Sequence, residues 1–152
     1  MQEMLELYRK AWAGAGHQPG TEQVHMSYTA YVRPTRAQAL DAGREYEGQY
    51  LASLLEAVQS WGRTSSTAYP GYDQLVDRIS QITFEGQLAD TKVLAGTPDE
   101  VRDQLATIAG WFGSDVTLSL QVNPGTMPFE EAAAGMRLFA EQVAPEPAGT
   151  PA

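Results

Sequence analysis

Two segments in which apolar and polar residues strictly alternate constrain the fold of this chain most. In the first, apolar side chains occupy every second position: Val24, Met26, Tyr28, Ala30 and Val32. The second repeats the pattern with Val116, Leu118, Leu120 and Val122. Successive side chains of a strand point to opposite faces, so this pattern predicts two strands with one apolar and one polar face.

The residues around these strands have helical periodicity. Apolar residues spaced for one helix face predict helices over 4–15, over 36–58 and from Phe129 onward. Thr35 with Gln38, and Thr97 with Glu100, form capping boxes, and Pro98 suits a first helical position. The apolar side of the second helix is predicted to comprise Leu40, Tyr46, Tyr50, Leu51, Leu54, Leu55 and Val58.

The middle of the chain has weaker signals. Residues 62–71 read GRTSSTAYPG, a polar, turn-rich composition that predicts a loop. A short helix is predicted over 72–79 and a short strand over 92–95, whereas 82–89 fits either a helix or a strand. The second capping box then opens a helix whose inner side includes Val101, Ile108 and Phe112.

Alternation of helices and strands favours an α/β fold with parallel strands. Strands with only one apolar face suit a barrel, in which that face meets the outer helices, better than a doubly wound sheet, whose strands are apolar on both faces. The three or four predicted strands do not close a barrel. We therefore expect a partial (β/α)8 TIM barrel over residues 1–145, followed by a disordered tail over 146–152.

Composition excludes several classes of function. The net charge of −9 and the absence of a cluster of Lys and Arg argue against a nucleic-acid partner. Cysteine is absent, which removes disulfides and thiolate chemistry. No run of 18 apolar residues is present, and the first residues are acidic rather than signal-like, so we expect no membrane span and a cytoplasmic location.

Familiar chemical motifs are also missing. Gly14-Ala15-Gly16 resembles the start of a dinucleotide fingerprint, but Pro19 stands where the third Gly belongs. The two histidines, His17 and His25, have no carboxylates at metal-ligand spacing, so we predict no metal site. The acidic pairs at 99–100 and 130–131 lie in first helical turns, where the helix dipole explains them.

Four polar residues near the ends of the predicted strands are the candidate pocket residues. Tyr31 and Arg33 lie at the end of the first strand, and Gln121 and Asn123 at the end of the last. The carboxyl ends of parallel barrel strands form the active-site face, so these side chains are expected to line a small-molecule pocket. Ordinary turn chemistry is the alternative for Asn123.

Several motifs, taken in order, resemble the luciferase-like flavin monooxygenases, the bacterial luciferase family. They are YVRPT at 31–35, VLAGTPDEV at 93–101, NPGTMPFE at 123–130 and MRLFAEQV at 136–143. The resemblance runs from Met4 to Pro145 and corresponds to the C-terminal half of the family's barrel. Pro124 and Thr126 depart from the family's turn, in which a different residue and a second Gly are usual.

The resemblance implies a monooxygenase or related oxidoreductase that uses reduced flavin, FMN, and O2 on a small organic substrate, with F420 as an alternative cofactor. It also implies that the N-terminal strands and the usual loop for the flavin phosphate are missing. We therefore expect an N-terminal-half partner chain or a homo-oligomer, because an open half-barrel leaves strand edges unpaired.

Two other interpretations stay open. In the first, the chain is a truncated relative that has lost flavin and acts as a binding or assembly protein in a homo-oligomer. Alternatively, it is a small cofactor-free enzyme with a pocket between Tyr31, Gln121 and the loop at 62–71.

Overall fold

The computed structural model describes residues 2–60, 71, 74–113 and 116–144. Its elements follow one another as α1 (Gln2–Gly14), β1 (His25–Val32), α2 (Arg36–Ala42), the π-helical turn η1 (Gly43–Glu47), α3 (Gly48–Val58), α4 (Leu75–Ser80), α5 (Phe84–Ala89), β2 (Leu94–Gly96), α6 (Pro98–Phe112), β3 (Thr117–Gln121) and α7 (Phe129–Gln142). The predicted strands and main helices are thus confirmed, and the ambiguous segment before β2 is the helix α5. The predicted tail and most of the predicted 62–71 loop lie outside the described residues.

The three strands form one parallel sheet in the order β2-β1-β3. Thr117 N donates to Val24 O, whereas Arg33 N donates to Gly96 O. Val24 and Arg33 lie an odd number of residues apart, so their backbone groups point to opposite edges of β1. The first strand, β1, is therefore the central strand of the sheet. If the strands followed their order in the chain, β2 would be the central strand instead.

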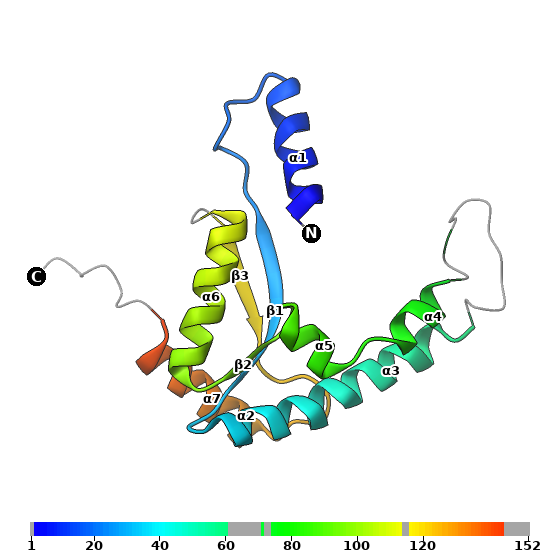
Figure 1. The fold of residues 1–152 in the computed structure, drawn as a ribbon, viewed down its shortest axis with the longest axis vertical. Coiled ribbons are helices and arrows are strands. Elements are labelled where there is room, and N and C mark those ends of the chain that lie inside the picture. Colours follow the sequence, from blue (N-terminus) through cyan, green and yellow to red (C-terminus); the bar gives the residue numbers. More distant parts are fainter. Residues whose placement is uncertain (1, 61–70, 72–73, 114–115, 145–152) are drawn as a thin grey trace, which may run out of the picture.

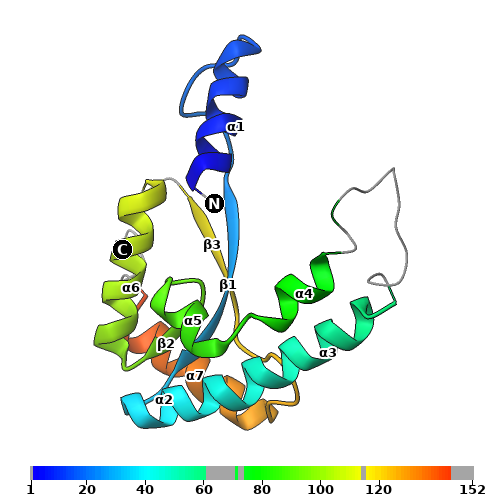
Figure 2. The same ribbon diagram turned by 45° about the vertical axis from the view of Figure 1, so that its right-hand side comes forward.

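Two hydrophobic clusters hold the sheet. The apolar face of β1, with Tyr28, Ala30 and Val32, packs on α6 and α7, as the alternating pattern predicts for a strand covered by outer helices. The opposite face carries Tyr31, which is buried with Ala42, Tyr46 and Phe84 from the helices on that side. Figures 1 and 2 show α1 standing beyond one end of the sheet while α3 and α4 extend to one side.

The predicted single helix over 36–58 is interrupted by η1. A π turn adds a residue to the helical repeat and rotates the chain that follows it. Tyr46 in this turn is buried, but Tyr50, predicted on the same apolar side, is 39% exposed. The prediction for Tyr50 is therefore wrong, because it assumed an unbroken helical period.

The N-terminus of α6 confirms its predicted cap. The Thr97 hydroxyl accepts from Glu100 N, and the Glu100 carboxylate accepts from Thr97 N at 2.9 Å. Thr35 caps α2 by accepting from Gln38 N, but the Gln38 side chain accepts from the Thr35 hydroxyl rather than from its backbone. These two caps fix where the chain turns after β1 and β2.

Candidate functional site

The carboxyl ends of the strands lie at one edge of the sheet. Tyr31 pairs with Ala95 and Val32 with Gly96, while Gln121 at the end of β3 pairs with Thr29. The segments that follow the strands therefore leave from the same edge, beside α2 and the start of α7 (Figure 1). Functional groups in parallel α/β proteins gather at this edge.

Arg33, the first residue after β1, contacts both β1 and α7 at this end of the sheet. Its Nη1 donates to Val32 O at 3.1 Å, and its Nη2 lies 3.5 Å from Glu131 Oε2. The Tyr46 hydroxyl donates to the other oxygen of Glu131 at 3.2 Å. A Cβ at Gly135 would lie 2.8 Å from Arg33 Nη1, so a glycine in α7 is what allows the guanidinium to approach.

A cavity of about 350 Å³ opens beside these groups, and we name it the strand-end pocket. It is lined by Arg33, Pro34, Gln38, Asp41, Ala42, Glu45, Tyr46 and Glu131. Three of these residues are acidic and one is basic. Burial, followed by the hydrogen bond to Glu131, raises the pKa of Tyr46, so its hydroxyl stays protonated and can donate at neutral pH.

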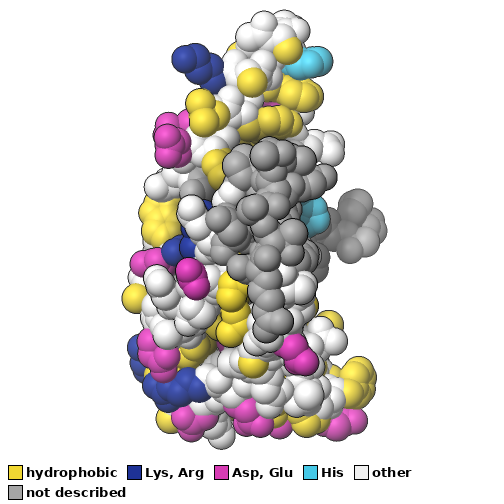
Figure 3. Space-filling model, turned by 90° about the vertical axis from the view of Figure 1, so that its right-hand side faces the viewer, with side chains coloured by type: hydrophobic (Ala, Val, Ile, Leu, Met, Phe, Trp, Pro, Cys, Tyr) yellow, Lys and Arg dark blue, Asp and Glu magenta, His cyan; other side chains and the backbone are white. Residues whose placement is uncertain are grey.

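The acidic character of this end extends over its surface. Figure 3 shows several Asp and Glu side chains, with some Lys and Arg, along the lower end of the molecule, the end that Figure 1 gives to α2 and its continuation. Arg44 is paired with two acids, Asp41 at 3.3 Å and Glu85 at 2.8 Å. The strand-end pocket is therefore suited to polar or cationic groups more than to anions.

Tyr31 lies next to the pocket but inside the protein. Its side chain is fully buried, and its hydroxyl donates to Glu47 Oε2 at 2.8 Å. Gln87 Nε2 donates to the other Glu47 oxygen at 3.1 Å. Burial and the bond to Glu47 raise the pKa of Tyr31. The triad of Tyr31, Glu47 and Gln87 ties β1 to η1 and α5, and it backs the pocket from the interior.

The other two candidate residues, Gln121 and Asn123, lie at the end of β3 and in the loop that follows it. Gln121 and Asn123 are both exposed. The loop that follows them is held by Gln49, whose Oε1 accepts from Thr126 N at 2.9 Å and from Thr126 Oγ1 at 2.6 Å. Gly125 has a φ of +64°, and a Cβ there would lie 2.8 Å from Tyr46 O, so this turn requires glycine. The structure brings Arg33 into the pocket but leaves Gln121 and Asn123 on the surface beside it.

Sequence patterns did not predict Glu47, Tyr46 or Glu131 as site residues. Tyr46 read as a core aromatic, and Glu131 as an acid that favours a helix N-terminus. The clearest missed signal is Glu47, an acid that directly follows an aromatic residue predicted to lie in the core. In the structure Glu47 is 2% exposed, and a carboxylate buried to this extent needs hydrogen-bond donors around it.

The described residues hold neither a metal-binding cluster nor a membrane-spanning helix. That part of the chain has no group of three or more His, Cys, Asp or Glu placed to hold a metal ion. None of its helices combines the length and apolar character needed to cross a membrane.

Comparison with known proteins decides the family. Residues 1–115 match the family described as luciferase-like monooxygenase. The chain belongs to this family. The match covers most of the chain, including the capped turn after β2, and it confirms the resemblance seen in the sequence. No curated protein matches the chain.

Solved structures of this family share the fold. A monooxygenase from Streptomyces bottropensis, RslO1, is 38% identical with a TM-score of 0.59, and the alignment covers 93% of this chain and 36% of that protein. The riboflavin lyase RcaE, solved with modified FMN and riboflavin, is 20% identical with a TM-score of 0.57, covering 99% of this chain and 38% of that one. EDTA monooxygenase EmoA from Chelativorans sp. BNC1 is 18% identical with a TM-score of 0.52, covering 93% and 37%.

This chain therefore spans little more than a third of the length of these solved relatives. The last two structures are too distant to show more than the fold. The fold is α/β, with a three-stranded parallel sheet and flanking helices that correspond to part of a luciferase-like barrel enzyme.

Proposed function

We propose that this chain supplies part of the active site of a flavin-dependent monooxygenase that uses reduced flavin and O2 on a small organic substrate. The observation that carries the proposal is the strand-end pocket around Arg33, in a chain that belongs to the luciferase-like family. Such barrels build their active sites at the carboxyl ends of their strands. A cytoplasmic location belongs to this proposal and is supported by the acidic, cysteine-free composition.

The strand-end pocket does not fit the phosphate of FMN. Its lining combines Asp41, Glu45 and Glu131 with Arg33 alone, and the Arg33 guanidinium already lies against Glu131. The carboxylates of the lining would repel a phosphate dianion bound in this pocket. We therefore assign no flavin step to these residues, and the proposal has the cofactor held by other parts of the assembled enzyme.

The role proposed for the pocket is to hold the substrate. The Arg33 guanidinium has further N–H groups that can donate to a carbonyl or hydroxyl oxygen of the substrate, and the Tyr46 oxygen, whose one proton goes to Glu131, can accept from a substrate hydroxyl. Glu131 contacts both groups and so fixes where they point. The buried triad behind the pocket keeps β1 and η1 at a constant spacing while the substrate binds.

The proposal includes a second chain. The solved relatives are nearly three times as long as the part that this chain covers. Several large apolar side chains of the described residues are exposed, among them Met4 at 73%, Phe129 at 79% and Met136 at 54%. Exposed apolar surface of this kind is typical of a contact with another chain, here an N-terminal-half partner or a further copy.

The test is product formation by the assembled protein. Protein purified from its source cells is incubated with reduced FMN, O2 and a panel of uncharged aldehydes, ketones and alcohols, and products with one added oxygen atom are sought by mass spectrometry. We expect a product that requires reduced flavin. Replacing FMN by reduced F420 in the same assay tests the alternative cofactor.

Arg33→Ala should lower kcat/KM by about tenfold, the cost of losing one charge-assisted hydrogen bond to substrate. Arg44→Ala, which removes the surface contacts with Asp41 and Glu85, is the matched control and should leave kcat/KM unchanged. Flavin-independent product, or no product from any member of the panel, contradicts the proposal.

The acidic lining favours a second candidate function. A relative that has lost flavin, and that serves as a binding or assembly protein in a homo-oligomer, needs no phosphate site. This alternative predicts a stable assembly of identical chains without bound flavin. The cofactor-free enzyme receives less support, because the Tyr31 hydroxyl that it requires is buried against Glu47.

A further inference from the structure

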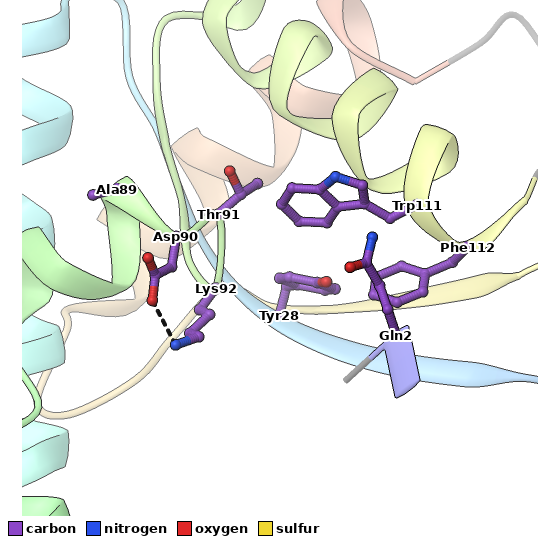
Figure 4. A pocket seen from close by; sticks show the side chains of 8 residues that line it. All are labelled: Gln2, Tyr28, Ala89, Asp90, Thr91, Lys92, Trp111 and Phe112. Atoms are coloured by element: carbon purple, nitrogen blue, oxygen red, sulfur yellow. Dashed lines mark hydrogen bonds and ion pairs between the residues drawn. The ribbon is translucent and has the colours of Figure 1, made fainter. Parts of the chain in front are cut away.

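A second cavity lies beside the amino-terminal half of β1, away from the strand-end pocket. Its volume is about 410 Å³, within the range of roughly 300 to 1,000 Å³ that is typical of small-molecule sites. Figure 4 shows its walls, which come from the start of α1, the middle of β1, the turn before β2 and the end of α6. We name it the aromatic slot.

Three aromatic side chains form one side of the slot. Tyr28 and Phe112 belong to the core and are 3% and 2% exposed, so they provide a rigid floor. Trp111 packs edge-on against Phe112, with ring centroids 6.1 Å apart, and is 41% exposed. In Figure 4 the Trp111 indole lies over the Tyr28 ring with the cavity beside it. An open tryptophan face above a buried tyrosine offers a stacking surface for a flat ring.

Thr91, on the facing wall, has a strained backbone. It is the only non-glycine among the described residues with a positive φ, at 50°. Thr91 N donates to Leu88 O at 3.1 Å and Lys92 N donates to Gln87 O at 2.8 Å, which is the hydrogen-bond pattern of a helix end that normally carries glycine.

A β-branched residue costs free energy at such a position, and residues that persist there tend to have a function. In Figure 4 the Thr91 side chain faces Trp111 across the slot, with its methyl group on the Trp111 side. Glycine would relieve the strain but would leave this wall without a side chain.

The polar rim indicates the charge of the ligand. Lys92 Nζ lies 2.6 Å from Asp90 Oδ2, so the one cation of the lining is already balanced by a carboxylate. Burial raises the pKa of Tyr28, which therefore remains a neutral hydroxyl. The whole chain carries a net charge of −9, which disfavours anions. These features favour an uncharged ligand.

We propose that the aromatic slot binds one planar, uncharged aromatic molecule, stacked on Trp111 above Tyr28, with the Thr91 side chain at its edge. This site shares no residue with the strand-end pocket. The proposal can therefore be tested independently of the monooxygenase activity.

The test uses 2-naphthol as a probe and isothermal titration calorimetry of the full chain. We expect saturable binding with one site per chain. Trp111→Ala should weaken the affinity about tenfold, because it removes the stacking surface. Trp111→Phe, which restores a ring, should recover most of the affinity.

Trp12→Ala is the matched control, because Trp12 stacks on His17 with ring centroids 4.1 Å apart and does not line the slot. It should leave the affinity unchanged. Thr91→Gly provides a second variant, since it relieves backbone strain and is expected to fold. It should weaken binding of 2-naphthol about threefold by removing the side chain that packs at the edge of the ligand.

Absence of saturable binding overturns the proposal, and so does binding that Trp111→Ala leaves intact. A separate apolar cavity of about 290 Å³ lies against α7 and is lined in part by Met136 and Phe139. If Met136→Ala rather than Trp111→Ala weakens the affinity, 2-naphthol occupies that cavity and the proposal is wrong.

Discussion

At the carboxyl end of β1, buried polar groups meet closely packed helices, whereas the amino-terminal half borders an open slot walled by aromatic rings. A Cβ on Gly43 would lie 2.3 Å from the Phe84 ring, and Tyr31, Glu47 and Gln87 satisfy one another. The slot instead contains an exposed tryptophan and a strained threonine. The comparison indicates that one end of the strand is rigidly held while the other has room for a ligand, and mutations at the two ends should separate these properties.

The largest effect is expected for Gly43→Ala. The new methyl group meets the Phe84 ring, which cannot retreat because it packs edge-on against Tyr31 with ring centroids 6.1 Å apart. Overpacking of this kind should lower the free energy of unfolding by about 2–3 kcal/mol, as urea denaturation would measure. Gly48→Ala is the control, because its Cβ meets nothing within 4 Å and alanine favours the helix. Equal destabilisation by both variants would contradict close packing at Gly43.

Tyr31→Phe should have the next largest effect. It removes the donor at 2.8 Å from Glu47 and leaves that buried carboxylate with Gln87. The free energy of unfolding should fall by about 1–2 kcal/mol. Tyr28→Phe, at an equally buried tyrosine that lines the slot, should change stability less. A reversed ranking would show that the triad does not stabilise the carboxyl end.

The raised pKa values of two buried tyrosines, Tyr31 and Tyr46, predict how the stability of the protein changes at alkaline pH. Burial and bonds to acids raise the pKa values of Tyr31 and Tyr46 above the value of about 10 in the unfolded chain. Above about pH 10 the unfolded state ionises first, so the free energy of unfolding should fall as pH rises further. Urea midpoints between pH 8 and pH 11 would measure the fall, which should be shallower in Tyr31→Phe. An unchanged slope in that variant would contradict the assignment to Tyr31.

The smallest effect is expected at the slot. Thr91→Gly should raise the free energy of unfolding by about 1 kcal/mol, because glycine adopts a φ of 50° without strain. Thr107→Gly, within α6, should instead lower it by roughly 0.3 kcal/mol, the difference between the helix propensities of threonine and glycine. Thermal denaturation distinguishes the two signs. Destabilisation by Thr91→Gly would mean that the threonine side chain contributes more packing than its backbone costs.

The sequence predicted local structure better than it predicted which residues meet. The alternating pattern located β1 and β3, and Thr97 with Glu100 located the start of α6, because strand faces and helix caps depend on neighbours in the chain. The position of Arg33 after a strand was also enough to nominate it for the pocket. Whether any of the four candidates, Tyr31, Arg33, Gln121 and Asn123, contacts a ligand stays a prediction.

Features that depend on distant contacts were missed. The π turn at η1 is not visible in a helical pattern, and Tyr50, which follows it, is exposed. Glu47 gains its partners from β1 and α5, which lie 16 and 40 residues away. The aromatic slot joins Tyr28 of β1 to Trp111 of α6, and nothing in the local sequence of either residue indicates the other.

The most direct test of the central claim is native mass spectrometry of the protein purified from its source cells under conditions that preserve non-covalent contacts. The account predicts a complex that contains this chain, a second and different chain, and the mass of a flavin. A 16.5 kDa species, or a homo-oligomer without flavin, would contradict it.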